Sequence, residues 1–287
     1  MIKHKYLRPR SLDVACQLLS ETRGKVLAGG TDLMVQLRAE DEKLKNINHV
    51  IDINHLKELS YIKKEDGYIH IGGLTTHQEI QESDLIQKEA AFLALAVSTV
   101  GSPQIRNRGT IGGSICNASP AADPLPPLIA LNADVKLKSV RGERTLPLVS
   151  IFQKPYSTCL EPDEILVEIS FKSLPETTKT TFIKLGRRKA LAIARMNIAV
   201  ALDFLADGTI TEARIVPGSV FPTPDRVTAA EEFMLNKKPT VELIEQASKM
   251  VSEEMIKRTG IRWSTEYKQP VIENLTKRAI KQILGVE

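Results

Sequence analysis

Cysteine is scarce in this chain of 287 residues. The three cysteines, Cys16, Cys116 and Cys159, lie far apart, and no CxxC pair is present. An iron–sulfur cluster or a structural zinc site takes about four such ligands, so neither can be built from this chain alone. Free thiols are typical of a reducing compartment. We therefore expect a cytoplasmic protein without a metal site of its own.

Long apolar runs, aromatic residues and an excess of one charge are also lacking. No uninterrupted apolar stretch approaches the roughly 20 residues of a membrane-spanning helix, so no membrane span is expected. Aromatic residues make up 5% of the chain, and 39 basic residues against 35 acidic ones give a net charge of +4. This composition predicts neither a stacking surface for bases nor a strongly basic face, and so no nucleic-acid partner.

A glycine-rich segment, residues 108–123, is the most informative part of the sequence. Its core, Thr110-Ile111-Gly112-Gly113-Ser114, has two adjacent glycines that leave backbone N–H groups uncovered by side chains. We expect these groups to form a concave binding site for an anion. The short polar residues Asn117 and Ser119 follow, and then Asp123, whose carboxylate suits sugar hydroxyls. The segment favours a nucleotide with a diphosphate and a ribose-like chain.

A similar loop, Ala28-Gly29-Gly30-Thr31-Asp32-Leu33, lies earlier in the chain; we call it the first glycine loop and residues 108–123 the second glycine segment. It leaves an apolar strand expected at 25–28 and enters a helix expected at 31–39, whose N-terminus favours anions. Neither loop contains a lysine or arginine, and neither has the spacing of GxGxxG or GxxxxGK[ST]. Two ordinary tight turns would explain either loop alone. The two loops together predict a binding site for one diphosphate, in which each loop binds one of the two phosphate groups.

The remaining pattern predicts alternating strands and helices. The first glycine loop opens a β-α-β unit that ends in a strand at 49–53, and a hairpin joins 60–64 to 68–72. Thr76 and Glu79 form a capping box at the start of a helix, and an apolar helix is expected over 87–99. His77 has no nearby His or Cys partner, so a structural role is favoured. Further elements are expected as short strands at 135–139 and 165–171, three strands at 182–187, 198–205 and 210–217, and helices at 126–131, 226–235, 240–257 and 270–284.

Several phrases resemble the FAD-binding medium subunit of the molybdenum hydroxylases, a family that includes xanthine dehydrogenase and carbon monoxide dehydrogenase. The phrases are Ala28–Leu33, Thr75-Thr76-His77, Val100–Gly113 and Gly186-Arg187-Arg188. The resemblance covers essentially the whole chain. It implies an α+β fold: a two-part FAD-binding domain of the vanillyl-alcohol-oxidase (PCMH) type, followed by a C-terminal domain with a three-stranded antiparallel sheet and helices. The implied bounds are 1–175, with subdomains of about 1–55 and 56–175, and 178–287. The polar, proline-containing stretch 172–180 agrees with that boundary.

The resemblance also implies which residues hold FAD. The two glycine loops would bind the diphosphate, Asp123 the ribityl or ribose hydroxyls, and Leu166 and Lys184 would lie near the flavin. Strand alternation places Lys184 on the face opposite its apolar neighbours. The full set of expected FAD-binding residues is Ala28, Gly29, Gly30, Thr31, Asp32, Leu33, Gly101, Thr110, Ile111, Gly112, Gly113, Ser114, Asn117, Asp123, Leu166 and Lys184. No catalytic and no metal-binding residue is expected.

The implied function is electron transfer within a complex. A large subunit with molybdenum cofactor would oxidise the substrate, and a small subunit with [2Fe-2S] clusters would pass electrons to this FAD. The flavin would give them to NAD⁺ or another acceptor, in a heterotrimer that itself dimerises. Arg195, close to the expected flavin edge, leaves the identity of the acceptor open. Alternatives are a self-contained FAD-dependent oxidoreductase acting on a small substrate, a reductase of a cell-wall precursor with the same FAD fold, and a non-catalytic nucleotide-binding module.

Overall fold

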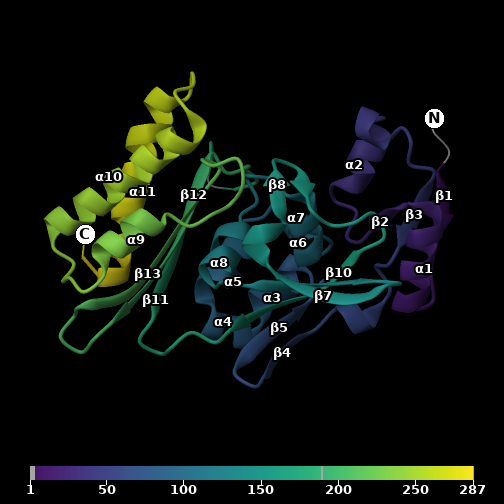
Figure 1. Ribbon diagram of the computed structural model, residues 1–287, viewed down its shortest axis with the longest axis horizontal. Helices are drawn as coiled ribbons and strands as arrows, with labels where there is room; N and C mark the ends of the chain where they lie inside the picture. The colour runs from purple at the N-terminus through teal and green to yellow at the C-terminus, as the bar shows by residue number, and fades with distance from the viewer. Residues whose placement is uncertain (1–3, 189, 287) are drawn as a thin grey trace.

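The computed structural model describes residues 4–188 and 190–286. In Figure 1 the chain runs from a small N-terminal sheet, through a central sheet with short helices, to a sheet covered by long C-terminal helices. This combination of one parallel and several antiparallel sheets with helices is the expected α+β class. None of the described helices is long and apolar enough to cross a membrane.

The N-terminal sheet is parallel and has the order β1-β3-β2. Its strands are β1 (Lys5–Leu7), β2 (Lys25–Leu27) and β3 (His49–Asp52), with α1 (Leu12–Thr22) and α2 (Leu33–Arg38) between them. The predicted β-α-β unit is therefore confirmed as β2, α2 and β3. Ser11 caps α1 by accepting a hydrogen bond from the N–H of Val14, as its sequence position indicates. The apolar face of α1 packs on β3.

The central sheet has five antiparallel strands in the order β4-β5-β10-β6-β7. They are β4 (Ile62–Glu65), β5 (Tyr68–Gly72), β6 (Asp134–Ser139), β7 (Gly142–Pro147) and β10 (Ile165–Lys172). The hairpin of β4 and β5 is confirmed. Strand β7 was not predicted, because it is an almost wholly exposed edge strand without apolar alternation. A small hairpin of β8 (Phe152–Lys154) and β9 (Ser157–Thr158) follows it.

Six short helices cover this sheet: α3 (His77–Glu82), α4 (Asp84–Glu89), α5 (Ala91–Ser98), α6 (Pro103–Arg106), α7 (Ile111–Asn117) and α8 (Leu125–Ala130). The prediction of one helix over 87–99 is wrong. The chain leaves the helical region at Ala90, with φ −152° and ψ 55°, and divides the stretch into α4 and α5. Alanine is the best helix former, so no residue type indicates this break in the sequence.

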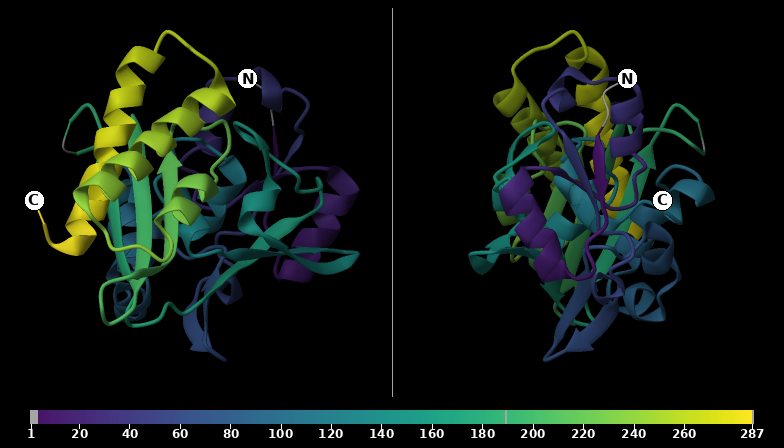
Figure 2. Two further views of the ribbon diagram at one scale, coloured as in Figure 1. Left: turned by 60° about the vertical axis from the view of Figure 1, so that its left-hand side comes forward. Right: turned by 90° about the vertical axis from the view of Figure 1, so that its right-hand side faces the viewer.

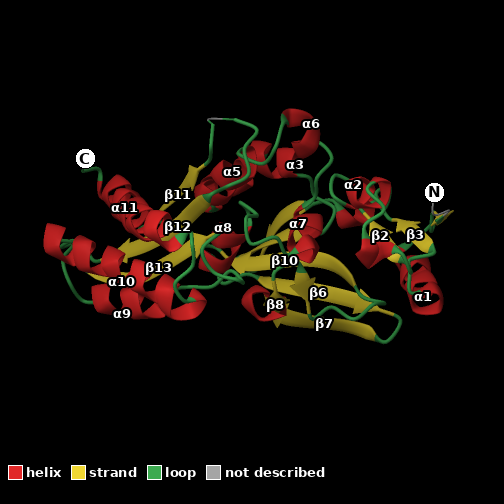
Figure 3. Cartoon of the chain, turned by 90° about the horizontal axis from the view of Figure 1, so that it is seen from above, coloured by secondary structure: helices red, strands yellow, loops and turns green. Residues whose placement is uncertain are grey.

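The C-terminal sheet is antiparallel and consists of β11 (Lys179–Leu185), β12 (Met196–Phe204) and β13 (Ile210–Gly218). Helices α9 (Thr228–Met234), α10 (Val241–Thr259) and α11 (Thr265–Leu284) cover one face, and α5 and α8 pack on the other (Figures 2 and 3). Alternate residues of β12 serve the two faces: Ile198 and Val200 face the long helices, and Ala199 packs with the core of the central part. Helix α11 begins five residues earlier than predicted and contains Pro270 in its second turn.

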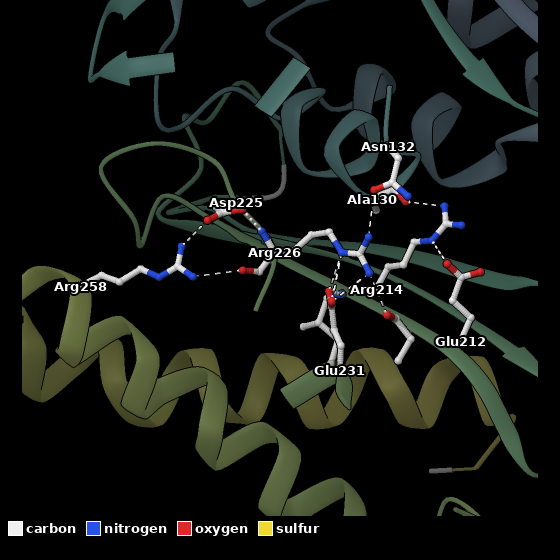
Figure 4. Close-up of polar contacts among 10 residues, drawn as sticks. Ala130, Asn132, Glu212, Arg214, Asp225, Arg226, Glu231 and Arg258 are labelled. Atoms are coloured by element: carbon white, nitrogen blue, oxygen red, sulfur yellow. Dashed lines mark hydrogen bonds and ion pairs between the residues drawn. The ribbon is translucent and has the colours of Figure 1, made fainter. Parts of the chain in front are cut away.

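Arginine side chains tie the C-terminal sheet to the end of α8 (Figure 4). Arg214 donates to the carbonyl oxygen of Ala130 at 2.8 Å, and Arg226 donates to Oδ1 of Asn132 at 2.9 Å. The same Arg226 guanidinium forms an ion pair of 2.9 Å with the buried carboxylate of Glu231. These contacts fix α8, whose N-terminus directly follows Asp123, against the C-terminal sheet.

Candidate functional site

The first glycine loop connects β2 to α2 and offers unpartnered backbone donors. No acceptor among the described residues takes the N–H groups of residues 29–32. Gly30 has φ +77°, a left-handed conformation that residues with a Cβ adopt only at a cost. Asp32 precedes α2 without capping it through its side chain. Four consecutive free N–H groups in such a turn suit an anion such as a diphosphate.

The core of the second glycine segment forms the first turn of α7, and the N–H groups of residues 111–114 are all hydrogen-bonded within the chain. The four backbone N–H groups of residues 111–114 donate to the carbonyl oxygens of Thr75 and Gly73, both at 3.0 Å, and to the hydroxyl and carbonyl oxygens of Thr110, at 3.1 and 3.0 Å. These four groups are therefore not the uncovered donors that the adjacent glycines suggest, and a contact of this segment with FAD stays a prediction. Gly112 has a packing role instead, because a Cβ there would lie 2.6 Å from the carbonyl oxygen of Gly73.

The two glycine segments meet, as their pairing in the sequence predicts. A Cβ at Gly29 would lie 2.0 Å from the carbonyl oxygen of Arg108, so only glycine allows the first loop to touch the second segment. On the other side of this contact, a Cβ at Gly109 would lie 3.5 Å from Oγ1 of Thr31. The free donors of residues 29–32 are thus held beside the start of α7.

His77 supports this contact and was not predicted as a site residue. Its ring nitrogen Nε2 lies 3.0 Å from Oγ of Ser114, and its backbone N–H donates to the carbonyl oxygen of Gly109. Burial lowers the pKa of His77 to about 4, assisted by the charge of Arg106, so the ring is neutral at pH 7. The ring atom Nδ1 has no partner among the described residues. The residues next to His77 in the sequence do not indicate this role, because its partner Ser114 is 37 residues away.

Asp123 lies in a buried polar cluster at the junction with the C-terminal sheet. Lys184 and Asn197 are direct partners across β11 and β12, so both side chains leave the same face of the sheet. Lys184 Nζ is 2.6 Å from Oδ2 of Asp123, and Asn197 Nδ2 donates to Oδ1 at 2.9 Å. Lys184 also donates to the carbonyl oxygen of Thr99 at 2.9 Å. Lys184 thus points away from its apolar neighbours, as predicted, and toward the FAD-binding part of the chain.

Burial raises the pKa of Asp123, and the charge of Lys184 with the hydrogen bonds from Lys184 and Asn197 opposes that rise. Asn197 is fully buried, and its Oδ1 has no partner among the described residues. A buried unpaired oxygen is costly in a structural role, which makes Asn197 a candidate site residue that sequence reasoning missed. Each oxygen of a carboxylate accepts more than one hydrogen bond, so Asp123 keeps capacity for a hydroxyl donor.

The other expected site residues lie near either the contact of the two glycine segments or the cluster of Asp123 and Lys184. Gly101, with φ +50°, follows Thr99 and so lies near the Lys184 cluster. Leu166 is buried in β10, where its carbonyl oxygen would lie 2.3 Å from a Cβ at Gly73. Because Gly73 in turn contacts Gly112, these residues stack beneath α7. Asn117 is the last residue of α7, and Ala28 and Leu33 border the first loop.

Family models and relatives agree on one assignment. The model "FAD binding domain in molybdopterin dehydrogenase" matches residues 2–173, and "CO dehydrogenase flavoprotein C-terminal domain" matches residues 181–283. The xanthine dehydrogenase FAD-binding subunit of Escherichia coli O157:H7 is 33% identical over 98% of this chain and 96% of the relative. The nicotinate dehydrogenase FAD-subunit of Eubacterium barkeri is also 33% identical, with the same coverage.

Among solved structures, carbon monoxide dehydrogenase from Hydrogenophaga pseudoflava superimposes with a TM-score of 0.91 at 30% identity, covering 99% of this chain and 98% of that one. The chain belongs to the family of FAD-binding medium subunits of the molybdenum hydroxylases. It is an oxidoreductase subunit, and its cofactor is FAD. The residues fit this cofactor, because the free donors of residues 29–32 suit a diphosphate and the Asp123 carboxylate suits a sugar hydroxyl.

Proposed function

We propose that this chain carries electrons from the [2Fe-2S] clusters of a small subunit, through its FAD, to NAD⁺ or another acceptor. The third partner is a large subunit with molybdenum cofactor, which oxidises the substrate. The three subunits form a heterotrimer that dimerises and works in the cytoplasm. The three cysteines of the chain, all of them free and far apart in the sequence, support a source of electrons outside it, since one cluster takes about four ligands.

The observation that carries this proposal is the contact of the two glycine segments. It places four unpartnered N–H groups beside α7, at the N-terminal sheet, while the Lys184 cluster lies at the C-terminal sheet. A dinucleotide cofactor has a diphosphate for the first place and sugar hydroxyls for the second. A bound flavin accepts and donates electrons, and the protein positions it.

The expected site residues have separate proposed roles in binding FAD. Residues 28–33 hold the diphosphate by backbone donors, and residues 110–114 with Asn117 form the wall beside it. Asp123 accepts from a ribityl or ribose hydroxyl, and Leu166, Lys184 and Gly101 border the ring. His77 and Asn197 position Ser114 and Asp123 through the hydrogen bonds described above.

The proposed domain division is 1–175, with subdomains of about 1–55 and 56–175, and 178–287. Three clusters of buried apolar side chains support it. One lies largely around α1 and β3, the second around the central sheet, and the third between the C-terminal sheet and α9–α11. Phe182, Ala199 and Val216 of the C-terminal sheet pack with the second cluster, so the two domains share a junction.

The test compares the isolated chain with the complex purified from its native host. The complex should oxidise its substrate with two acceptors: a dye that takes electrons before the flavin, and the physiological acceptor. A complex with Gly29→Ala should keep the first activity and lose the second along with its flavin. The isolated chain should oxidise no substrate, although it transfers electrons from NADH to a dye. Substrate turnover by the isolated chain would refute the proposal and favour a self-contained oxidoreductase.

A further inference from the structure

Three cationic side chains converge at one end of the C-terminal sheet. Arg195 directly precedes β12, Arg262 lies in the loop between α10 and α11, and Lys268 is in the first turn of α11. They come from segments about 70 residues apart in the sequence. The Arg195 guanidinium lies over the ring of Tyr267, 5.4 Å from the ring centre, and Tyr267 directly precedes Lys268 in α11.

None of the three cations forms an ion pair with a carboxylate in the described part of the chain. Arg262 donates to the carbonyl oxygen of Thr259 at 3.0 Å, and Lys268 donates to that of Ser219 at 2.7 Å. Burial lowers the pKa of Lys268, and the charges of Arg262 and Arg195 lower it further. Three like charges that repel one another, without a compensating carboxylate, favour binding of an anion.

This cationic cluster lies close to the Lys184 cluster. The N–H of Arg195 donates to the carbonyl oxygen of Leu185, the residue after Lys184, at 2.8 Å. Two residues farther along β12 is Asn197, a strand distance of about 7 Å. Ser219, the acceptor of Lys268, directly follows Gly218, which pairs with Asn197. The cationic cluster and the Lys184 cluster are therefore neighbours at the same end of the C-terminal sheet.

We propose that Arg195, Arg262 and Lys268 bind the diphosphate of a dinucleotide electron acceptor. This inference rests on the proposed function and names where the acceptor binds and by what chemistry. A diphosphate carries negative charges on two adjacent phosphate groups. Three cations that lie close together can therefore bind its oxygens at the same time. The exposed rings of Tyr267 and Trp263, the latter 97% exposed, offer surfaces for a base. The half-buried Lys268 and the exposed Trp263 ring together favour a nucleotide, which has both a diphosphate and a base, over an acidic protein surface.

The test uses the full chain saturated with FAD, so that the FAD site itself is filled. Calorimetric titration measures the Kd of ADP-ribose, which has the diphosphate and the base of NAD⁺ but no nicotinamide. Arg195→Gln and Arg262→Gln should each raise this Kd at least fivefold. The matched control is Arg278→Gln, an exposed arginine about three turns farther along α11, which removes the same charge and should change the Kd less than twofold.

Three results would overturn the inference: no binding of ADP-ribose to the wild-type chain, equal loss in all three variants, or a Kd that none of them changes. The inference would also be overturned if Arg195→Gln and Arg262→Gln weakened electron transfer to an acidic protein acceptor and left the Kd of ADP-ribose unchanged. Failure of the proposed function is distinguishable, because it would appear as substrate turnover by the isolated chain, whether or not ADP-ribose binds.

Discussion

Gly29→Ala tests whether the contact between the two glycine segments forms the FAD site. In the native chain a Cβ at this position would lie 2.0 Å from the carbonyl oxygen of Arg108 and 3.0 Å from Cα of Gly109. Ordinary contact begins at 3.4 Å, and both neighbours are backbone atoms that no side-chain rotation can remove. The first loop and residues 108–109 must separate by about 1 Å or more, at a cost in stability of about 1–3 kcal/mol.

The effect on FAD affinity should be larger than the effect on stability. A separation of this size moves backbone donors out of hydrogen-bond distance of a diphosphate. A hydrogen bond to a charged group contributes about 1.5–3 kcal/mol, so losing two of the four free donors costs about 3–6 kcal/mol. We therefore expect the Kd for FAD to rise by a factor of about 100 or more.

The assay is a titration of the flavin-free chain with FAD, followed by the change in flavin fluorescence, with thermal unfolding recorded in parallel. Gly67→Ala is the control: its φ is +77°, nothing lies within 4 Å of its Cβ, and it is in the β4–β5 turn away from the site. That variant should lose about 1–2 kcal/mol of stability from backbone strain and keep its FAD affinity. An unchanged Kd in folded Gly29→Ala would refute the reasoning.

Three further predictions concern buried side chains. Between pH 6.5 and about 4 the unfolded chain protonates His77 and the native chain does not, so the native state should lose up to about 3 kcal/mol as the pH falls through this window. In His77→Gln, urea unfolding should show a shallower pH dependence; equal slopes would contradict this. Lys184→Met leaves the Asp123 carboxylate buried without its cation and should cost about 3–5 kcal/mol in thermal unfolding. The double variant with Asp123→Leu should cost less than the sum, and strict additivity would argue against the pair. Arg226→Gln removes the partner of buried Glu231 and should speed amide exchange in α9 (Thr228–Met234); unchanged exchange would show that the ion pair adds no stability.

Features set by neighbouring residues were predictable from the sequence. The capping box is confirmed: Thr76 Oγ1 accepts from the N–H of Glu79, and the Glu79 carboxylate accepts from the N–H of Thr76. The hairpin turn at 65–67 and the three C-terminal strands follow from equally local patterns. In each case the residues that determine the structure lie within one turn or one strand of each other, so the order of residue types is sufficient.

The hydrogen bonding of the second glycine segment was not predictable in this way. Adjacent glycines indicate exposed N–H groups only if no acceptor is near. Here Gly73 and Thr75 supply acceptors from 39 and 36 residues away, and Thr110 caps the turn. The same limit applies to His77 and Asn197, whose partners Ser114 and Asp123 are distant in the sequence. Hydrophobic periodicity shows which face of a helix or strand a residue occupies. It does not show which residue of another element lies opposite that face.

The Lys184 cluster shows how folding and cofactor binding are connected in this chain. Strand alternation alone places Lys184 and Asn197 on one face of the C-terminal sheet, but their partner Asp123 belongs to the FAD-binding part. Asp123 directly precedes α8, and Arg214 and Arg226 hold the other end of that helix to the same sheet. A shift between the two parts would move the Asp123 carboxylate away from Lys184 and leave a buried charge unpaired, a cost of several kcal/mol. The packing of the domains therefore sets the geometry at Asp123, and a ligand that binds there stabilises both domains as one unit.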